Sequence, residues 1–255
     1  MKRIMKRTGF ILLAFALLFS HIFSASALGA VEREEGRIIF LLYHDLCAGK
    51  IMEDDDPAYT TTDEKFEHDI RVLLSMGYDS LSLEQYYNKE YKEDGNYFVI
   101  TFDDGYLSNY ELAYPIMKKL GVYGDIFINT ESVKFPHHFS YDQAREMEES
   151  GVVKIYSHLA THSRATEMKR EVFLKMAKSA YEEIERELGE RNRFLAYPYS
   201  DHDKVTSEIA KSLGTKLQFV QVTDSRVDGV YYNTVKRVNI SYTDDIREVV
   251  EAYFK

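Results

Sequence analysis

The sequence predicts an α/β fold, organised as a mainly parallel sheet or barrel in a single domain. Apolar, strand-like runs recur along the chain, and helix-like segments lie between most of them. This alternation is typical of parallel strands joined by helical crossovers. The chain after residue 27 has the length of one large domain and shows no internal repeat, linker or low-complexity segment.

The predicted strands are short apolar runs bounded by polar or turn-forming residues. They cover residues 38–43, 97–101, 123–128, 152–157, 193–197, 216–222 and 234–240. Helical segments are predicted between them at residues 61–78, 108–121, 140–151, 166–188, 206–214 and 244–254. The first helical segment has apolar residues at helical spacing, an N-cap near Thr62 and a terminating Gly77.

The first 27 residues resemble a secretory signal peptide rather than part of the fold. Four basic residues lie within the first seven positions, residues 9–19 are apolar, and Ala25-Ser26-Ala27 forms a small-x-small cleavage site. Because the apolar run is too short for a comfortable membrane span, we expect a secreted or extracytoplasmic protein of residues 28–255. An uncleaved N-terminal anchor is the alternative.

Composition and charge indicate which partners and which disulfide bonds the chain can have. The formal net charge is −10, and loss of the four basic residues of the predicted signal would make it about −14, which argues against nucleic acid or an anionic membrane surface as the main partner. No protein partner is predicted. Cys47 is the only cysteine, so no intrachain disulfide can form. The chain has 20 tyrosines and no tryptophan, which suits core edges or a sugar-binding cleft.

Polar residues follow several predicted strands at the point where each strand ends. His44 follows the first strand, Asp103 and Asp104 follow the second, and His158 and His162 follow the fourth. In α/β folds the carboxyl ends of parallel strands meet at one edge, where active sites form. Each feature alone has a simple structural explanation, but together they predict one site.

The cluster has the composition of a catalytic metal site. Adjacent carboxylates at a strand end point in different directions, so one can bind a metal while the other faces the substrate. His158 and His162 are four residues apart, which on a helical turn places both imidazoles on one side. With Asp104 they form a three-ligand set that leaves positions open, as in catalytic zinc sites.

The segments "TFDDG" (residues 101–105) and "SHLATHS" (residues 157–163) resemble the polysaccharide deacetylase family, the NodB-homology domain of carbohydrate esterase family four. The resemblance extends over residues 59–86, 194–214 and 235–240. It implies a distorted (β/α) barrel of about seven strands. It also implies metal-dependent N-deacetylation of an N-acetylglucosamine polymer of the cell wall or an exopolysaccharide, with zinc as the usual metal.

The resemblance also assigns roles to residues. Asp103 would be the general base. The metal ligands would be Asp104, His158 and His162. Tyr199 would lend its backbone N–H to the oxyanion, and Tyr199 and Pro198 of the third motif would form the substrate-binding and oxyanion side of the site.

The chain departs from the usual family pattern in its third and last motifs. Ala196 stands where an arginine usually orients the base, and Ser200 replaces a glycine. No histidine follows residues 235–240, where many members carry the general acid. These departures leave open a catalytically impaired carbohydrate-binding homologue, or a metal hydrolase of another acetylated substrate.

A second pattern accounts for the absent histidine. The chain resembles the circularly permuted branch of exported poly-N-acetylglucosamine deacetylases, in which the acid histidine lies near the start of the domain in a "YH" pair. Here that pair is Tyr43-His44. His44 is therefore the expected general acid, and Arg237, also on a strand, is a candidate for the orienting arginine.

Overall fold

The computed structural model describes residues 36–221 and 232–255. The predicted signal peptide and the domain boundary at residue 28 lie outside these residues, as does residue 222 at the end of one predicted strand. Within the described residues, no helix combines the length and apolar character needed to cross a membrane.

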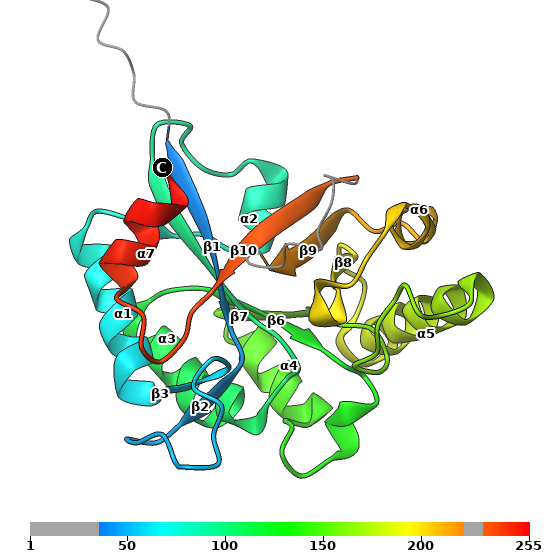
Figure 1. Cartoon of the computed structure of the whole chain (residues 1–255), viewed down its shortest axis with the longest axis horizontal. Coiled ribbons are helices and arrows are strands. Elements are labelled where there is room, and N and C mark those ends of the chain that lie inside the picture. Colours follow the sequence, from blue (N-terminus) through cyan, green and yellow to red (C-terminus); the bar gives the residue numbers. More distant parts are fainter. Residues whose placement is uncertain (1–35, 222–231) are drawn as a thin grey trace, which may run out of the picture. The chain divides into compact units, whose positions relative to one another are not determined.

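Seven parallel strands form a closed barrel, which confirms the predicted fold class (Figure 1). Around the barrel they follow the order β1-β10-β9-β8-β7-β6-β5, and β5 pairs with β1 to close it. The strands are β1 (Arg37–Tyr43), β5 (Asn96–Phe102), β6 (Gly124–Ile128), β7 (Val153–Ser157), β8 (Phe194–Ala196), β9 (Leu217–Gln221) and β10 (Thr234–Asn239). Each corresponds to one of the predicted apolar runs.

The strand register fixes which residues meet at the carboxyl edge. Tyr43 of β1 lies opposite Phe102 of β5, so His44 and Asp103 follow at neighbouring positions. On the other side, β1 pairs with β10. The first and last strands of the domain are therefore neighbours, as the permuted arrangement requires.

Apolar side chains fill both the inside and the outside of the barrel. Inside, aromatic residues from several strands pack together, with the ring centroids of Phe127 and Phe219 5.0 Å apart. Outside, residues such as Ile100 and Ile126 pack beneath the helices. Burial on both faces explains why these strands are continuous apolar runs.

The helices that surround the barrel are α1 (Asp63–Ser75), α3 (Tyr114–Leu120), α4 (Tyr141–Glu149), α5 (Arg170–Leu188), α6 (Lys204–Ser212) and α7 (Ile246–Tyr253). The predicted cap of α1 is confirmed, because the side chain of Thr62 accepts a hydrogen bond from the Lys65 N–H. The predicted helical segments are thus found, with ends shifted by a few residues.

Several short elements have no counterpart in the prediction. They are β2 (Asp45–Cys47), β3 (Thr60–Thr62), β4 (Asp79–Ser80) and α2 (Leu83–Asn88). The predicted helix over residues 108–121 is present, but it begins as a π-helical turn (Asn109–Ala113) before α3. Strand β2 begins directly after His44 and pairs in parallel with β3 as a separate two-stranded sheet. They form one wall of the site described next.

Candidate active site

The carboxyl ends of the barrel strands border one cavity of about 360 Å³. His44 from the end of β1, Asp103 and Asp104 from the end of β5, and His158 and His162 beyond β7 all line it. The lining also includes four tyrosines: Tyr59, Tyr106, Tyr197 and Tyr199. The structure thus brings together the residues that the strand pattern predicted to meet.

Asp104, His158 and His162 form a cluster whose ligand atoms all lie within 4.8 Å of one another. The Nε2 atom of each histidine is 3.5 Å from Oδ1 of Asp104. Two atoms that share a zinc ion at about 2.0–2.2 Å in tetrahedral geometry are about 3.3–3.6 Å apart. Asp104 Oδ1 is also buried without a hydrogen bond from the described residues. These residues therefore fit a divalent metal.

Backbone groups hold His158 in the orientation that a ligand needs. Its N–H donates to the Ile128 carbonyl at 2.8 Å, and its Nδ1 lies 2.9 Å from the Ala196 carbonyl oxygen. Because a carbonyl only accepts, Nδ1 carries the proton and Nε2 presents its lone pair to the cluster. Burial lowers the pKa of His158 to about 3, which keeps the imidazole neutral.

The prediction of a helical turn between His158 and His162 is wrong. The residues after β7 form a loop of bends, and Leu159 has a φ of 68°. The Thr130 N–H donates to the Leu159 carbonyl at 3.2 Å and holds this loop against the end of β6. The imidazoles converge, with ring centroids 5.2 Å apart, through this loop path.

Asp103 is buried and paired with Arg237 of β10. Nη1 and Nη2 of Arg237 each lie 2.7 Å from a different carboxylate oxygen, a bidentate geometry. Burial alone would raise the pKa of Asp103, but Arg237 and then His158 outweigh it and hold that pKa at about 2. The arginine suggested by its strand position therefore contacts the suggested base.

Asp104 has a different environment from its neighbour. Its φ of 72° turns the chain at the end of β5, and Gly105 continues the turn with a φ of 77°. A Cβ at Gly105 would lie 2.7 Å from the Ile128 side chain, so the glycine is required there. Burial and the charge of Asp103 raise the pKa of Asp104 to about 7. A bound cation would favour its ionised form.

His44 lies at the cavity wall, between the two short strands and the barrel. Burial lowers its pKa to about 4, although the nearby Asp103 acts in the opposite direction. Its Nδ1 is buried without a hydrogen-bond partner among the described residues. Its ring packs edge-on against Tyr59, with centroids 5.0 Å apart.

The third-motif residues lie on the opposite side of the cavity. Tyr199 and Ser200 have φ values of 57° and 55°, which turn the chain sharply after β8. Tyr199 lines the cavity. Pro198 is buried and is not among the described residues that line the cavity. The role of the Tyr199 N–H as an oxyanion donor stays a prediction.

Two residues beside the site, Asn109 and Tyr59, have no clear signature in the sequence. Asn109 is fully buried and donates from Nδ2 to the His44 carbonyl at 2.8 Å. It begins a π-helical turn, a rare geometry that is frequent at functional sites. Its amide in a mostly apolar helical segment is the one signal that could have identified it.

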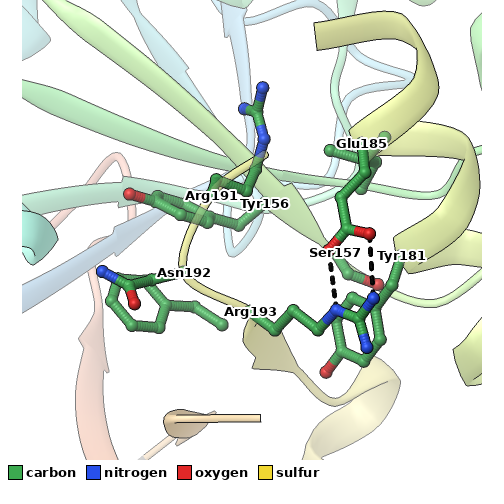
Figure 2. Close-up of a pocket in the computed structure, with 9 residues that line it drawn as sticks. Tyr156, Ser157, Tyr181, Glu185, Arg191, Asn192 and Arg193 are labelled. Atoms are coloured by element: carbon green, nitrogen blue, oxygen red, sulfur yellow. Dashed lines mark hydrogen bonds and ion pairs between the residues drawn. The ribbon is translucent and has the colours of Figure 1, made fainter. Parts of the chain in front are cut away.

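A second, much smaller cavity lies between α5 and the start of β8 (Figure 2). Its volume of about 10 Å³ is close to the space of a single water molecule. Arg193 beside it forms a bidentate ion pair with Glu185, at 2.7 and 2.8 Å. This cavity is a packing feature, separate from the cluster of Asp104, His158 and His162.

A model of the polysaccharide deacetylase family matches residues 90–218. The chain belongs to the polysaccharide deacetylase family. This membership places it among hydrolases that act on acetylated polysaccharides. The matched stretch includes Asp103 and the cluster of Asp104, His158 and His162, whereas His44 and Arg237 flank it on either side.

Individual relatives agree with this assignment. The chain is 25% identical over 213 residues to YxkH of Bacillus subtilis (strain 168), which has a provisional description as a polysaccharide deacetylase; the match covers 80% of this chain and 72% of YxkH. The fold is similar to that of Streptococcus pyogenes deacetylase PplD, with a TM-score of 0.73, 20% identity and coverage of 86% and 98% of the two chains.

Two further solved structures share the fold. A de-N-acetylase from Aggregatibacter actinomycetemcomitans has a TM-score of 0.72 and 21% identity, with 84% of this chain and 99% of that chain covered. IcaB from Ammonifex degensii has a TM-score of 0.71 and 21% identity, with 86% and 98% covered.

Proposed function

We propose that this protein is an exported, metal-dependent polysaccharide deacetylase that hydrolyses the N-acetyl groups of an N-acetylglucosamine polymer of the cell wall or an exopolysaccharide. The observation that carries the proposal is the arrangement of one cavity. It combines a three-residue donor cluster with Asp103, a buried carboxylate held by Arg237. Export is proposed from the signal-like pattern of residues 1–27.

The metal would be held by Asp104, His158 and His162. We propose zinc as the ion, because zinc binds imidazole nitrogens and carboxylate oxygens in open three-ligand sites. When bound, it would polarise the acetamide carbonyl and lower the pKa of a water molecule. The backbone contacts of His158 fix the ligand orientation in advance.

Asp103 is proposed as the general base. Because Arg237 keeps its pKa at about 2, the carboxylate is ionised across the neutral range and can accept the proton of the attacking water. The hydroxide then adds to the carbonyl carbon. The backbone N–H of Tyr199 would stabilise the negative charge that develops on the oxygen.

His44 is proposed to deliver the proton to the leaving nitrogen. Its pKa of about 4 makes the imidazole neutral in the resting protein at pH 7. The pKa of Asp103 is about 2, so transfer of the abstracted proton from the carboxyl to the imidazole is favourable. The C–N bond then breaks to give acetate and the free amine.

Two alternatives follow from the departures at Ala196 and Ser200. One is a homologue that binds carbohydrate without turnover. The other is a metal hydrolase of a different acetylated substrate. The bidentate Arg237–Asp103 contact favours turnover, because it supplies to the base what Ala196 cannot.

Acetate release from a substrate panel tests the proposal. The panel contains chitin oligomers, poly-N-acetylglucosamine, peptidoglycan and acetylated xylan, each with zinc-loaded full-length protein. We expect release from at least one N-acetylglucosamine polymer and its loss in Asp103→Asn. The control is Asp79→Asn, at an exposed position of β4. Tight oligomer binding without acetate release would support the binding homologue instead, and release from xylan alone the other hydrolase.

A further inference from the structure

Tyr59 lies at the wall of the cavity with a half-exposed ring. Its side chain is 49% exposed although it lines the cavity. The His44 ring packs edge-on against the Tyr59 ring, with the ring centroids 5.0 Å apart and an interplanar angle of 81°. A large aromatic ring that is half exposed beside a catalytic cluster is available for a ligand.

The backbone fixes Tyr59 relative to His44. The Asp45 N–H donates to the Tyr59 carbonyl at 3.0 Å, and Asp45 then pairs with Thr60 as β2 and β3 begin. Figure 1 shows these two strands beside the carboxyl end of β1. Asn109 holds the His44 carbonyl from the other direction. These bonds fix the two backbone segments to each other, and the edge-on contact places the Tyr59 ring against the imidazole.

A second half-exposed tyrosine in the cavity provides a contrast. Tyr199 is also 49% exposed, but the guanidinium of Arg164 lies 4.5 Å from its ring centroid and the His162 ring is 4.3 Å away. Among the described residues, no cation lies over the Tyr59 ring. Of the two tyrosines, Tyr59 has the face that remains free.

We propose that Tyr59 is the stacking platform for a neutral pyranose unit of the glycan, next to the N-acetylglucosamine that reacts. This inference rests on the proposed function and adds a substrate-binding subsite on the His44 side. The C–H face of a pyranose is apolar and stacks on an aromatic ring, while its hydroxyl groups point outward. Because Tyr59 and His44 are fixed to each other, stacking would also set the sugar relative to the proton donor.

The charge of the cavity lining indicates that the stacked sugar unit is neutral. Its described lining includes four aspartates and neither lysine nor arginine. Two of them, Asp45 and Asp56, lie on the Tyr59 side. A unit with a carboxylate, such as a uronic acid, would face like charge there and has no cationic partner among the lining residues.

Steady-state kinetics on tetra-N-acetylchitotetraose, with zinc-loaded full-length protein, test the platform. Tyr59→Ala should raise KM about 3- to 10-fold, the range expected for loss of one aromatic contact. Tyr59→Phe keeps the ring and should recover most of the difference. The matched control is Tyr232→Ala, which truncates a tyrosine of 39% exposure before β10, at the opposite end of the barrel strands.

Calorimetric binding of the same oligomer to chelator-treated protein gives a readout that needs no turnover. Tyr59→Ala should weaken binding by the same factor, and an oligomer alternating with glucuronic acid should bind at least 10-fold more weakly than the neutral one. Unchanged affinity in Tyr59→Ala, a loss confined to kcat, or equal binding of the acidic oligomer would each overturn the inference. Binding that depends on Tyr59 without acetate release by the zinc-loaded protein would refute the proposed function alone.

Discussion

The pair of Arg237 and Asp103 offers a sharp test of how the base is maintained. The side chains are 1% and 5% exposed, and two N–O distances of 2.7 Å join them. Arg237→Met keeps an unbranched side chain in the barrel and removes the charge. The buried carboxylate then loses its bidentate partner.

The structure sets the size of the effect. Breaking a buried ion pair by removing one partner costs about 3–5 kcal/mol of unfolding free energy. Burial is the largest influence on the pKa of Asp103 and raises it, while Arg237 is the foremost group that lowers it. Without Arg237 the pKa rises well above its present value, and the ionised base is lost at the lower end of the pH range. Loss of a general base lowers the rate about 10²- to 10⁴-fold.

Two assays measure these effects. Urea denaturation gives the stability change, and acetate release across pH gives the acid limb of kcat/KM, which should move to higher pH in Arg237→Met. The matched control is Arg191→Met. Arg191 is 7% exposed and pairs with Glu148, whose side chain is 9% exposed; neither residue lines the candidate active site. It should lower stability without moving the acid limb.

A double variant completes the cycle. Arg237→Met with Asp103→Asn removes both charges and should recover most of the stability lost in the single variant, because no unpaired charge remains buried. Its activity should stay absent. An unmoved acid limb in Arg237→Met, or the same kinetic change in Arg191→Met, would refute the role of Arg237 as the group that sustains the base.

Three further predictions concern pH, positioning and the lone thiol. The pKa of His44 is about 4 in the folded protein, against an ordinary value of 6.5, so on acidification the unfolded chain binds a proton at this residue before the folded protein does. Acidification from pH 6.5 to 4 should therefore lower the unfolding free energy of metal-depleted protein by at most about 3 kcal/mol. Urea denaturation across this pH range should show a smaller loss of stability in His44→Gln. Asn109→Asp removes the donor to the His44 carbonyl and should lower kcat roughly 10-fold with KM little changed, whereas an equal rise in KM would contradict a positioning role. Cys47→Ser, at a half-buried residue without a disulfide, should change stability by less than about 1 kcal/mol in thermal denaturation.

The barrel could be predicted from the sequence because of how its strands are buried. Strands such as β1 and β5 pack on both faces, so each appears as a continuous apolar run between polar residues. Alternation with helical segments then indicates parallel strands. Strands β2 and β3 escaped prediction because each has three residues, and "TTT" of β3 carries no apolar period.

The site could be predicted only in part. The strand ends identify four residues of the candidate site, because the strand register brings those ends together. They are Asp103, Asp104, His158 and His162. The loop path between the histidines could not be predicted, because a spacing of four residues does not fix φ at Leu159. Arg237 is 134 residues from its partner, so only the closed barrel shows that they meet.

Acetate release before and after metal removal tests the role of the Asp104, His158 and His162 cluster. Full-length protein is treated with a chelator, its zinc content is measured, and it is assayed on N-acetylglucosamine oligomers before and after zinc is restored. We predict that release falls to background on depletion and returns with about one zinc per chain, and that His158→Ala neither retains zinc nor recovers activity. Undiminished acetate release from protein shown to be free of metal would contradict the proposed mechanism.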